Sequence, residues 1–321
     1  MGISREQALE CFRSDDLIGL GMEADAVRRR LHPEGVVTYA VGCSLDCAAL
    51  LGGGAGAEAR VDAACAEIEA AVRNGATSVR LLSGADVVRD GMYGPAWIEG
   101  VLRELRRRVP AAWIEGLPAA KVAEIAVRCG ISGREVIARM RDAGLDAIAG
   151  DGPELNDTAG VARWIDVHRA AHGVGMRTCA EMIFGAGETA EQRVDSLEAV
   201  RRLQEETGGF AAFVPTAAPA PNGRQLDSVT AVERLKTLAV ARMFLDTIEN
   251  VQADGAASGI DGLKVLQTAL RFGANDAGTV MVAGDRLPSV GTSEEDLRRI
   301  IRDAGFRPAE RDAAYRAMMV G

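Results

Sequence analysis

Residues Val36–Gly56 read VVTYAVGCSLDCAALLGGGAG and contain the features on which the fold assignment depends. The segment Val36–Val41 is rich in β-branched and aromatic residues, which predicts a buried strand. Cys43 and Cys47 follow, and we expect them in the loop after this strand, with three residues between them. Leu50 stands where a metal-binding loop of this kind would need a third thiolate. The stretch therefore predicts a first strand followed by an incomplete set of metal ligands.

Strand-like and helix-like segments alternate along the rest of the chain. The predicted strands are Val36–Val41, Ser78–Leu82, Ala112–Glu115, Asp146–Ala149, Met176–Phe184, Phe210–Thr216, Asn250–Ala253 and Gly278–Val282. Such alternation indicates an α/β fold with a parallel sheet, and eight units of this kind predict a (β/α)8 barrel of the TIM type. An open, doubly wound sheet is the alternative, but no GxGxxG motif follows a predicted strand.

Helical segments flank this barrel at both ends of the chain. We expect an N-terminal helical segment over residues 1–35, the barrel over residues 36–286 and a C-terminal helical extension over residues 287–321. No low-complexity linker separates these parts, so a single barrel domain with helical additions is expected.

The composition is that of an acidic globular protein. The 321 residues are 48% hydrophobic and 26% charged, with a formal net charge of −9 and no basic tract. These properties argue against nucleic-acid and membrane partners, and no apolar run approaches the ~20 residues of a membrane span. The polar N-terminal residues do not resemble a signal peptide, and the six scattered cysteines fit reduced thiols. We therefore expect a cytoplasmic protein that binds a small molecule, with a homodimer as a candidate assembly.

Acidic and amide side chains gather around the predicted strand ends, where the active sites of such barrels lie. The candidate catalytic residues are Glu115, Glu154 and Glu181. Glu154 follows a Gly-rich turn, where it either contacts a ribose or belongs to a capped loop. Asn275 and Asp276 either bind a polar substrate or form an Asx turn. The three histidines fall on helical segments or their ends, so a histidine-ligated zinc site is not expected.

Glu181 shares one face of its predicted strand with Arg177 and Cys179, because side chains alternate along a strand. A carboxylate directed into a barrel is costly unless it is paired. Glu181 therefore serves either as a general base or ligand contact, or as half of a structural ion pair with Arg177.

Cys43 and Cys47 have three interpretations. They supply two of the ligands of a zinc or iron–sulfur centre, with the others from Asp46, Cys179 or a second chain. Alternatively, they are small apolar residues in a tight loop, since free cysteine is often buried. In the third interpretation one of them is a nucleophile, although no histidine lies near in sequence to activate it. We favour the second interpretation and expect no metal at these residues unless a cluster is present.

A family resemblance is carried by EMIFGAGETAEQRVDSL, RRLQEETGGFAAFVP, LKVLQTALRFGANDAGTVMV and IIRDAGFRPAERDAAYR. Together with VRRRLHPEGVVTYAV, these segments resemble the radical S-adenosylmethionine (SAM) enzymes of the futalosine route to menaquinone. The branch that contains cyclic dehypoxanthine futalosine synthase is the most similar, with aminofutalosine synthase and the deazaflavin-forming synthases as cousins. The resemblance covers nearly the whole chain and implies a radical-SAM barrel with its substrate at the top.

The family pattern is interrupted where the family does its chemistry. The family has a CxxxCxxC loop whose three thiolates hold a [4Fe–4S] cluster. With Cys43 and Cys47 on the first two positions, Leu50 takes the third; in an alignment without gaps from Thr38, neither cysteine falls on a family cysteine. The triad is incomplete in both alignments. The family's strand-three histidine is replaced by Glu115, and a threonine of strand five by Glu181. The Gly-Gly motif that cradles the SAM amino acid reads Ser83-Gly84-Ala85. The ligand contacts predicted in this way are Tyr39, Ser83, Gly84, Arg177, Glu188, Asp254, Asn275 and Asp276.

These departures predict a cluster-independent enzyme of the transferase or lyase type. We expect elimination, cyclisation or group transfer on a nucleoside-like or SAM-like molecule, with SAM as a candidate cofactor and no iron–sulfur cluster. One alternative is a genuine radical SAM enzyme of the futalosine-cyclase type with an unusual cluster. Another is a non-catalytic binding paralogue. Iron content separates the first two, and a plugged barrel would mark the third.

Overall fold

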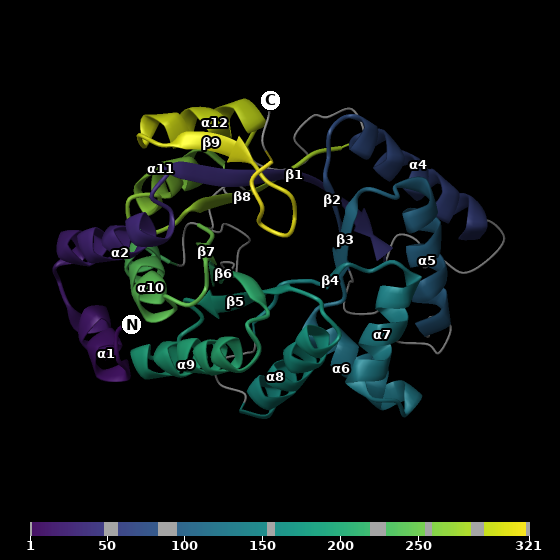
Figure 1. Ribbon diagram of the computed structural model, residues 1–321, viewed down its shortest axis with the longest axis horizontal. Helices are drawn as coiled ribbons and strands as arrows, with labels where there is room; N and C mark the ends of the chain where they lie inside the picture. The colour runs from purple at the N-terminus through teal and green to yellow at the C-terminus, as the bar shows by residue number, and fades with distance from the viewer. Residues whose placement is uncertain are drawn as a thin grey trace.

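The computed structural model describes residues 2–47, 57–82, 95–152, 158–218, 229–253, 259–283 and 292–318. Five residues that carry predictions or arguments above lie outside these ranges, namely Leu50, Ser83, Gly84, Glu154 and Asp254. Within the described ranges, helices surround a ring of strands (Figure 1).

The ring is the parallel barrel that the sequence predicts. Its strands are β1 (Val36–Asp46), β2 (Ser78–Leu82), β3 (Trp113–Gly116), β4 (Ala147–Ile148), β5 (Thr178–Phe184), β6 (Phe210–Ala217), β7 (Asn250–Val251) and β8 (Asp276–Met281). One sheet has the order β4-β3-β2-β1-β8 and a second has the order β5-β6-β7. Single bridges from Asp151 to Ala180 and from Gln252 to Asp276 join the two sheets and close the ring.

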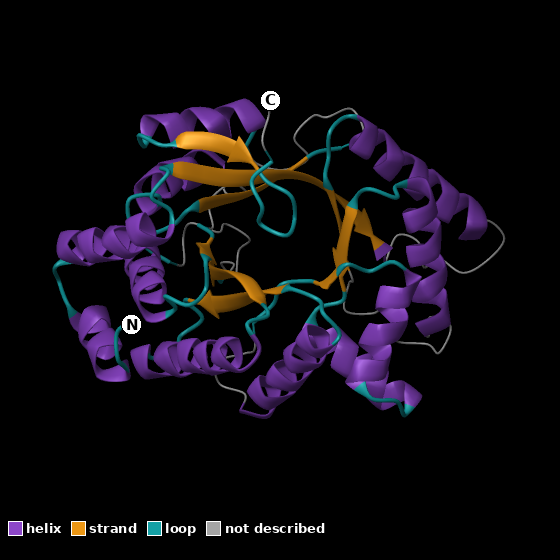
Figure 2. Cartoon of the chain, viewed as in Figure 1, coloured by secondary structure: helices purple, strands orange, loops and turns teal. Residues whose placement is uncertain are grey.

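Helices lie outside the ring and connect successive strands (Figure 2). They are α1 (Arg5–Arg13), α2 (Leu17–Leu31), α4 (Ala57–Arg73), α5 (Pro95–Arg108), α6 (Ala119–Cys129), α7 (Gly133–Ala143), α8 (Thr158–Gly173), α9 (Ala190–Thr207), α10 (Ala231–Phe244), α11 (Gly259–Ala269) and α12 (Glu294–Asp303). The N-terminal helices flank the barrel, because α1 packs on α9 and α10 and α2 packs on α10. Among the described helices, none combines the length and the apolarity needed to cross a membrane.

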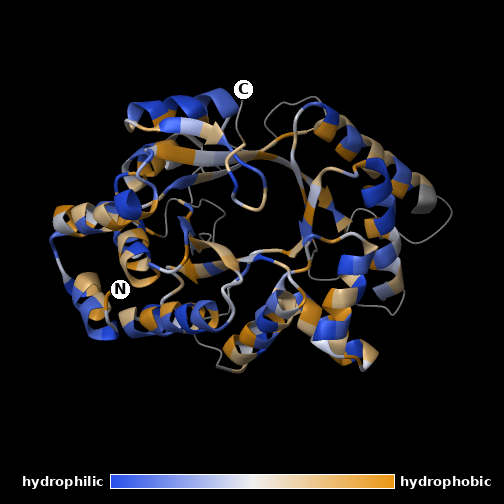
Figure 3. Ribbon diagram, in the orientation of Figure 1, coloured by the Kyte–Doolittle hydropathy of each residue, from blue (hydrophilic) through white to orange (hydrophobic). Residues whose placement is uncertain are grey.

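The hydrophobic core lies between the strands and the surrounding helices. Alternate residues of β1, from Val37 through Tyr39 and Val41 to Cys43 and Leu45, all belong to this core. Figure 3 shows polar and apolar residues interleaved along the outer helices, as expected for helices with one buried face. Because side chains alternate along a strand, the other residues of β1 face the lumen of the barrel.

β1 is longer than the sequence pattern predicts, since it ends at Asp46 and not at Val41. Gly42 reads as a loop residue, but it lies within the strand and permits a close approach of β2. A Cβ atom at Gly42 would lie 2.6 Å from Ser78 Oγ. Cys43 is in register with Val79 of β2. The prediction that Cys43 lies in a loop after the strand is therefore wrong.

The C-terminal segment contains a strand in addition to the predicted helix. After α12, β9 (Arg307–Glu310) pairs in parallel with the beginning of β1. The chain after β9 projects across the opening of the barrel and includes a bridge between Arg311 and Ala317 (Figure 1). β9 contains Pro308, which is tolerated because a proline is compatible with an edge strand.

Candidate active site in the barrel lumen

Charged and polar side chains from several strands meet inside the barrel with two side chains of the C-terminal segment. They are Arg80 (β2), Glu115 (β3), Cys179 and Glu181 (β5), Gln252 (after β7), Asp276 (β8), Arg311 and Tyr315. We refer to this group as the lumen cluster.

Arg80 and Glu115 form the ion pair of the lumen cluster. Arg80 Nε donates to Glu115 Oε1 at 2.6 Å and so connects β2 with β3. The charge of Glu115, followed by those of Glu181 and Tyr315, raises the pKa of Arg80 above its ordinary value. The Arg80 side chain is 46% exposed and that of Glu115 is 18% exposed. The pair is therefore a polar group, neutral overall, that a molecule in the lumen can reach.

Cys179 and Glu181 lie on the lumen face of β5. Residues of this strand alternate between buried and more exposed positions, as the sequence predicts. Burial, followed by the charge of Glu115, raises the pKa of the Cys179 thiol to about 12. The Glu181 N–H donates to the Asp151 carbonyl oxygen at 3.0 Å, where β4 meets β5. Arg177 is exposed at the other end of β5 and donates to the Phe210 carbonyl oxygen at 3.4 Å.

Arg311 and Tyr315 enter the lumen from the C-terminal segment. Arg311 forms a two-pronged ion pair with Asp276, in which Nη2 donates to Oδ1 at 3.0 Å and Nε donates to Oδ2. The Arg311 guanidinium lies 3.7 Å from the centre of the Tyr315 ring, and the Tyr315 hydroxyl donates to Gln252 Oε1 at 2.7 Å. Tyr315 has φ +63°, which is strained for an aromatic residue. The segment is therefore held inside the barrel by specific contacts.

Asn275 and Asp276 lie at the amino end of β8 and not at the carboxyl end of a strand. Asn275 Oδ1 accepts from Arg242 Nη2 at 2.6 Å and from the Val251 N–H at 2.9 Å. Asp276 is fully buried, and Thr38 Oγ1 adds a donor at 2.6 Å to its bonds with Arg311. Both side chains are thus engaged by other parts of the chain.

Tyr39 and Glu188 are engaged outside the lumen cluster. The buried Tyr39 hydroxyl donates to Glu294 Oε1 and accepts from Arg298 Nη1, both at 2.9 Å on α12. Glu188 accepts from the Gly185 N–H at 2.7 Å in the turn after β5, and its side chain is only 3% exposed. Neither side chain contributes to the lumen cluster.

Cys43 and Cys47 belong to the core outside the ring of strands. The Cys43 thiol donates to the Ser78 carbonyl oxygen at 3.6 Å. Burial raises the pKa of Cys43 to about 11, and burial with the charge of Asp46 raises that of Cys47 to about 12. Both thiols are thus packed in the core, and neither belongs to the lumen cluster. Across the described ranges, no three His, Cys, Asp or Glu side chains form a potential metal site.

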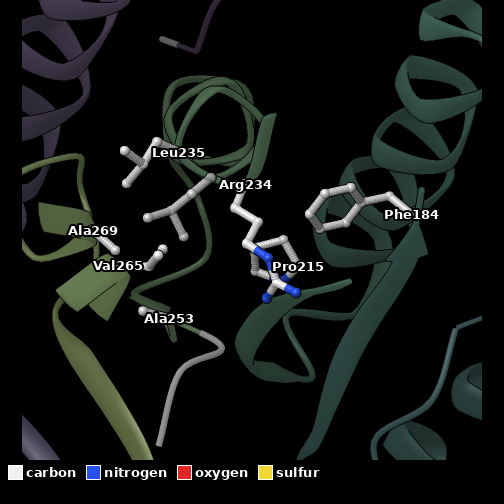
Figure 4. Close-up of a pocket in the computed structure, with 8 residues that line it drawn as sticks. Phe184, Pro215, Arg234, Leu235, Ala253, Val265 and Ala269 are labelled. Carbon is white, nitrogen blue, oxygen red and sulfur yellow. The ribbon is translucent and has the colours of Figure 1, made fainter. Parts of the chain in front are cut away.

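Two cavities differ in their relation to the lumen cluster, because Tyr315 of that cluster lines the larger of them. One, of about 20 Å³, lies beside α10 and α11, where Arg234 extends toward Pro215 and Phe184 (Figure 4). It holds about one water molecule and is a packing gap. The other, of about 770 Å³, lies at the amino ends of the strands, between residues such as Val36 and the C-terminal segment.

Four members of the lumen cluster were not predicted from the sequence, namely Arg80, Gln252, Arg311 and Tyr315. The alternation in SVRLL contained the information for Arg80, which shares a face with Ser78. Arg311 and Tyr315 fall in the segment ERDAAYR, which carries part of the family resemblance. No local pattern indicates that this segment returns to the barrel.

Comparisons with known proteins agree with this architecture. The solved structure of methylornithine synthase (PylB) has a TM-score of 0.67 to this chain at 14% identity, covering 98% of this chain and 96% of PylB. This likeness shows the barrel fold. The family model "CofH/MqnC C-terminal region" matches residues 207–320.

Two curated relatives extend over nearly the whole chain. Cyclic dehypoxanthine futalosine synthase of Streptomyces coelicolor is 31% identical over 99% of this chain and 86% of its own length. Aminodeoxyfutalosine synthase of Thermus thermophilus is 32% identical over 99% of this chain and 93% of its own length. The chain therefore belongs to the radical SAM family that includes these two futalosine synthases.

Proposed function

We propose that this member of the family is an enzyme that works without a [4Fe–4S] cluster and performs acid–base chemistry on a small molecule in the lumen. One observation carries the proposal: Cys43 is buried on the side of β1 that faces away from the lumen, and Cys47, just after β1, is buried in the same core. Leu50, which cannot bind iron, at the family's third cysteine position supports it.

The lumen cluster supplies groups for such chemistry. Glu181 is the proposed general acid or base, because its strand directs it into the lumen. The Arg80–Glu115 pair is the proposed binding group, since a guanidinium offers several donors to a polar ligand. Glu154 and Asp254 remain candidates that lie outside the described residues.

The proposed substrate is nucleoside-like, and the proposed reaction is an elimination, a cyclisation or a group transfer. The names of the relatives support this choice, because both are futalosine synthases. SAM is retained as a candidate ligand on the same grounds. No step of the proposed chemistry passes through a metal.

Iron and sulfide content after anaerobic purification and reconstitution tests the proposal. We compare the wild type with Leu50→Cys and with the double variant Cys43→Ser/Cys47→Ser. The expected result is the same low iron content and a colourless protein in the wild type and the double variant. About four irons per chain in the wild type, lost in the double variant, would overturn the proposal. In the same samples, an increase in melting temperature with SAM, adenosine or inosine identifies the ligand class.

The Leu50→Cys variant shows whether the missing cysteine alone prevents cluster assembly. Because Cys43 and Cys47 face the core, we expect this variant to remain as iron-poor as the wild type. A cluster in Leu50→Cys would mean that the loop can rearrange around iron. The orientation of the two cysteines would then no longer support the proposal.

A further inference from the structure

A continuous series of hydrogen bonds runs between α8 and β5, on the outer side of the barrel. Asp151 Oδ1 lies 3.3 Å from His168 Nε2, and His168 Nδ1 lies 2.9 Å from Thr178 Oγ1. Thr178 Oγ1 lies 2.9 Å from His172 Nε2, and His172 Nδ1 lies 2.7 Å from Thr207 Oγ1. The proposed function uses none of these side chains, although Asp151 contacts the backbone of Glu181.

The direction of the series is set at Thr207. The single hydroxyl proton of Thr207 is donated to the Leu203 carbonyl oxygen at 2.7 Å. Thr207 Oγ1 has no second proton to donate, so it must accept a hydrogen bond from His172 Nδ1. His172 Nδ1 therefore carries a proton. Burial, followed by the charge of His168, lowers the pKa of His172 to about 4. His172 is therefore neutral near neutral pH, and its Nε2 is an acceptor.

The same reasoning then fixes the protons of His168. Thr178 donates its hydroxyl proton to His172 Nε2, so it accepts from His168 Nδ1. The other ring nitrogen of His168 faces the carboxylate of Asp151, which already accepts from Trp164 Nε1 at 2.9 Å. His168 is fully buried. Two lone pairs facing each other there would be unfavourable, so a proton must lie between them.

From this arrangement we infer that His168 is protonated on both ring nitrogens and forms a buried ion pair with Asp151. The Trp164 and Phe210 rings cover the imidazole, with centroids 4.3 and 5.4 Å away. Among the described residues, the charges of Arg177 and Glu206 also act on this series, at His172.

The ion pair fixes the join between β4 and β5 behind the proposed site. Asp151 bridges to Ala180, and its carbonyl oxygen accepts the Glu181 N–H at 3.0 Å. His168 and Asp151 are therefore positioning residues for Glu181. This part of the inference depends on the proposed function only in treating Glu181 as a site residue.

The protonation of His168 is measured by NMR on the full-length protein with ¹⁵N-labelled histidine at neutral pH. We expect a histidine signal with two protonated ring nitrogens that is lost in His168→Gln. If His168→Gln does not fold, the signal is assigned by exclusion among the three histidines. The His32 signal is identified by its loss in His32→Gln, and His172 is identified by its neutral pattern. In Asp151→Asn, the amide can donate to Nε2, so His168 should become neutral. A neutral His168 in the wild type, protonated on either ring nitrogen alone, would overturn the inference.

The positioning role is measured by amide hydrogen exchange at Glu181. Replacing the charged hydrogen bond by a neutral one in Asp151→Asn should increase exchange of this amide about ten-fold. Asp166→Asn is the matched control. Asp166 lies on α8, the helix that carries His168, and its side chain is 76% exposed. Unchanged exchange at Glu181 in Asp151→Asn would remove the positioning role. Neither result depends on iron content, so the two proposals can fail separately.

Discussion

At the scale of single residues, the surroundings of a cysteine determine what it can do. Cys43 and Cys47 lie in the core with pKa values of about 11 and about 12. Cys129, at the end of α6, is exposed. The spacing of Cys43 and Cys47 in the sequence resembles a metal site, whereas their environment is that of apolar core residues.

We expect Cys43 and Cys47 to resist alkylation in the folded protein. At about pH 8, a thiol with a pKa near 11 is ionised in about one molecule in a thousand, and burial further limits access. Peptide mass spectrometry after a short treatment with iodoacetamide should show labelling of Cys129 at least about a hundred times faster. In urea the three cysteines should react alike. Rapid labelling of Cys43 in the folded protein would contradict its placement in the core.

At the scale of elements, β1 is the strand around which the barrel is assembled. It pairs with β2, β8 and β9 along successive parts of its length. The pairing with β2 begins at Gly42, where the backbone comes close to Ser78. A side chain at Gly42 would therefore displace the side chains of Ser78 on β2 and Thr279 on β8.

We expect Gly42→Ala to lower the free energy of unfolding by about 1–3 kcal/mol, because the added methyl group has no space. The new Cβ would lie 2.6 Å from Ser78 Oγ and 3.1 Å from Thr279 Cγ2. Gly100→Ala in α5 is the control, since a Cβ there meets no atom within 4 Å. This control should be neutral or more stable by up to about 1 kcal/mol. Thermal unfolding of both variants measures the difference, and equal melting temperatures would contradict the close packing at Gly42.

The sequence predicted the barrel because alternating strands and helices are a local pattern. It did not predict the end of β1, since Gly42 reads as a turn unless the position of Ser78 is known. Glu115 and Glu181 could be found from strand alternation and from their replacement of family residues. The contacts of Arg311 could not be predicted from the sequence. They join residues that are far apart in the chain, and they form only when the ring is closed.

At the scale of the whole molecule, the C-terminal segment closes one opening of the barrel. β9 extends the sheet beside β1, and the segment after it inserts Arg311 and Tyr315 into the lumen. Asp276 on β8 is the residue to which this segment is attached. The segment after β9, with Arg311 and Tyr315, therefore covers one end of the lumen.

Removing Arg311 tests how much the C-terminal segment contributes to the free energy of unfolding. Asp276 has 0% exposure, so Arg311→Ala leaves a buried charge without its ion-pair partner. We expect a loss of about 3–5 kcal/mol in the free energy of unfolding. Arg316→Ala is the control, because this arginine is 77% exposed and pairs with Asp312, four residues earlier on the surface. The control should change the free energy of unfolding by no more than about 0.5 kcal/mol.

A double variant shows whether the loss comes from the stranded charge. In Arg311→Gln/Asp276→Asn both charges are gone and the side chains can still share a hydrogen bond. Because the penalty of an unpaired buried carboxylate is removed, this protein should be more stable than Arg311→Ala by about 1–3 kcal/mol. Thermal unfolding compares the four proteins. If Arg311→Ala and Arg316→Ala unfold at the same temperature, the C-terminal segment does not hold the barrel through Asp276.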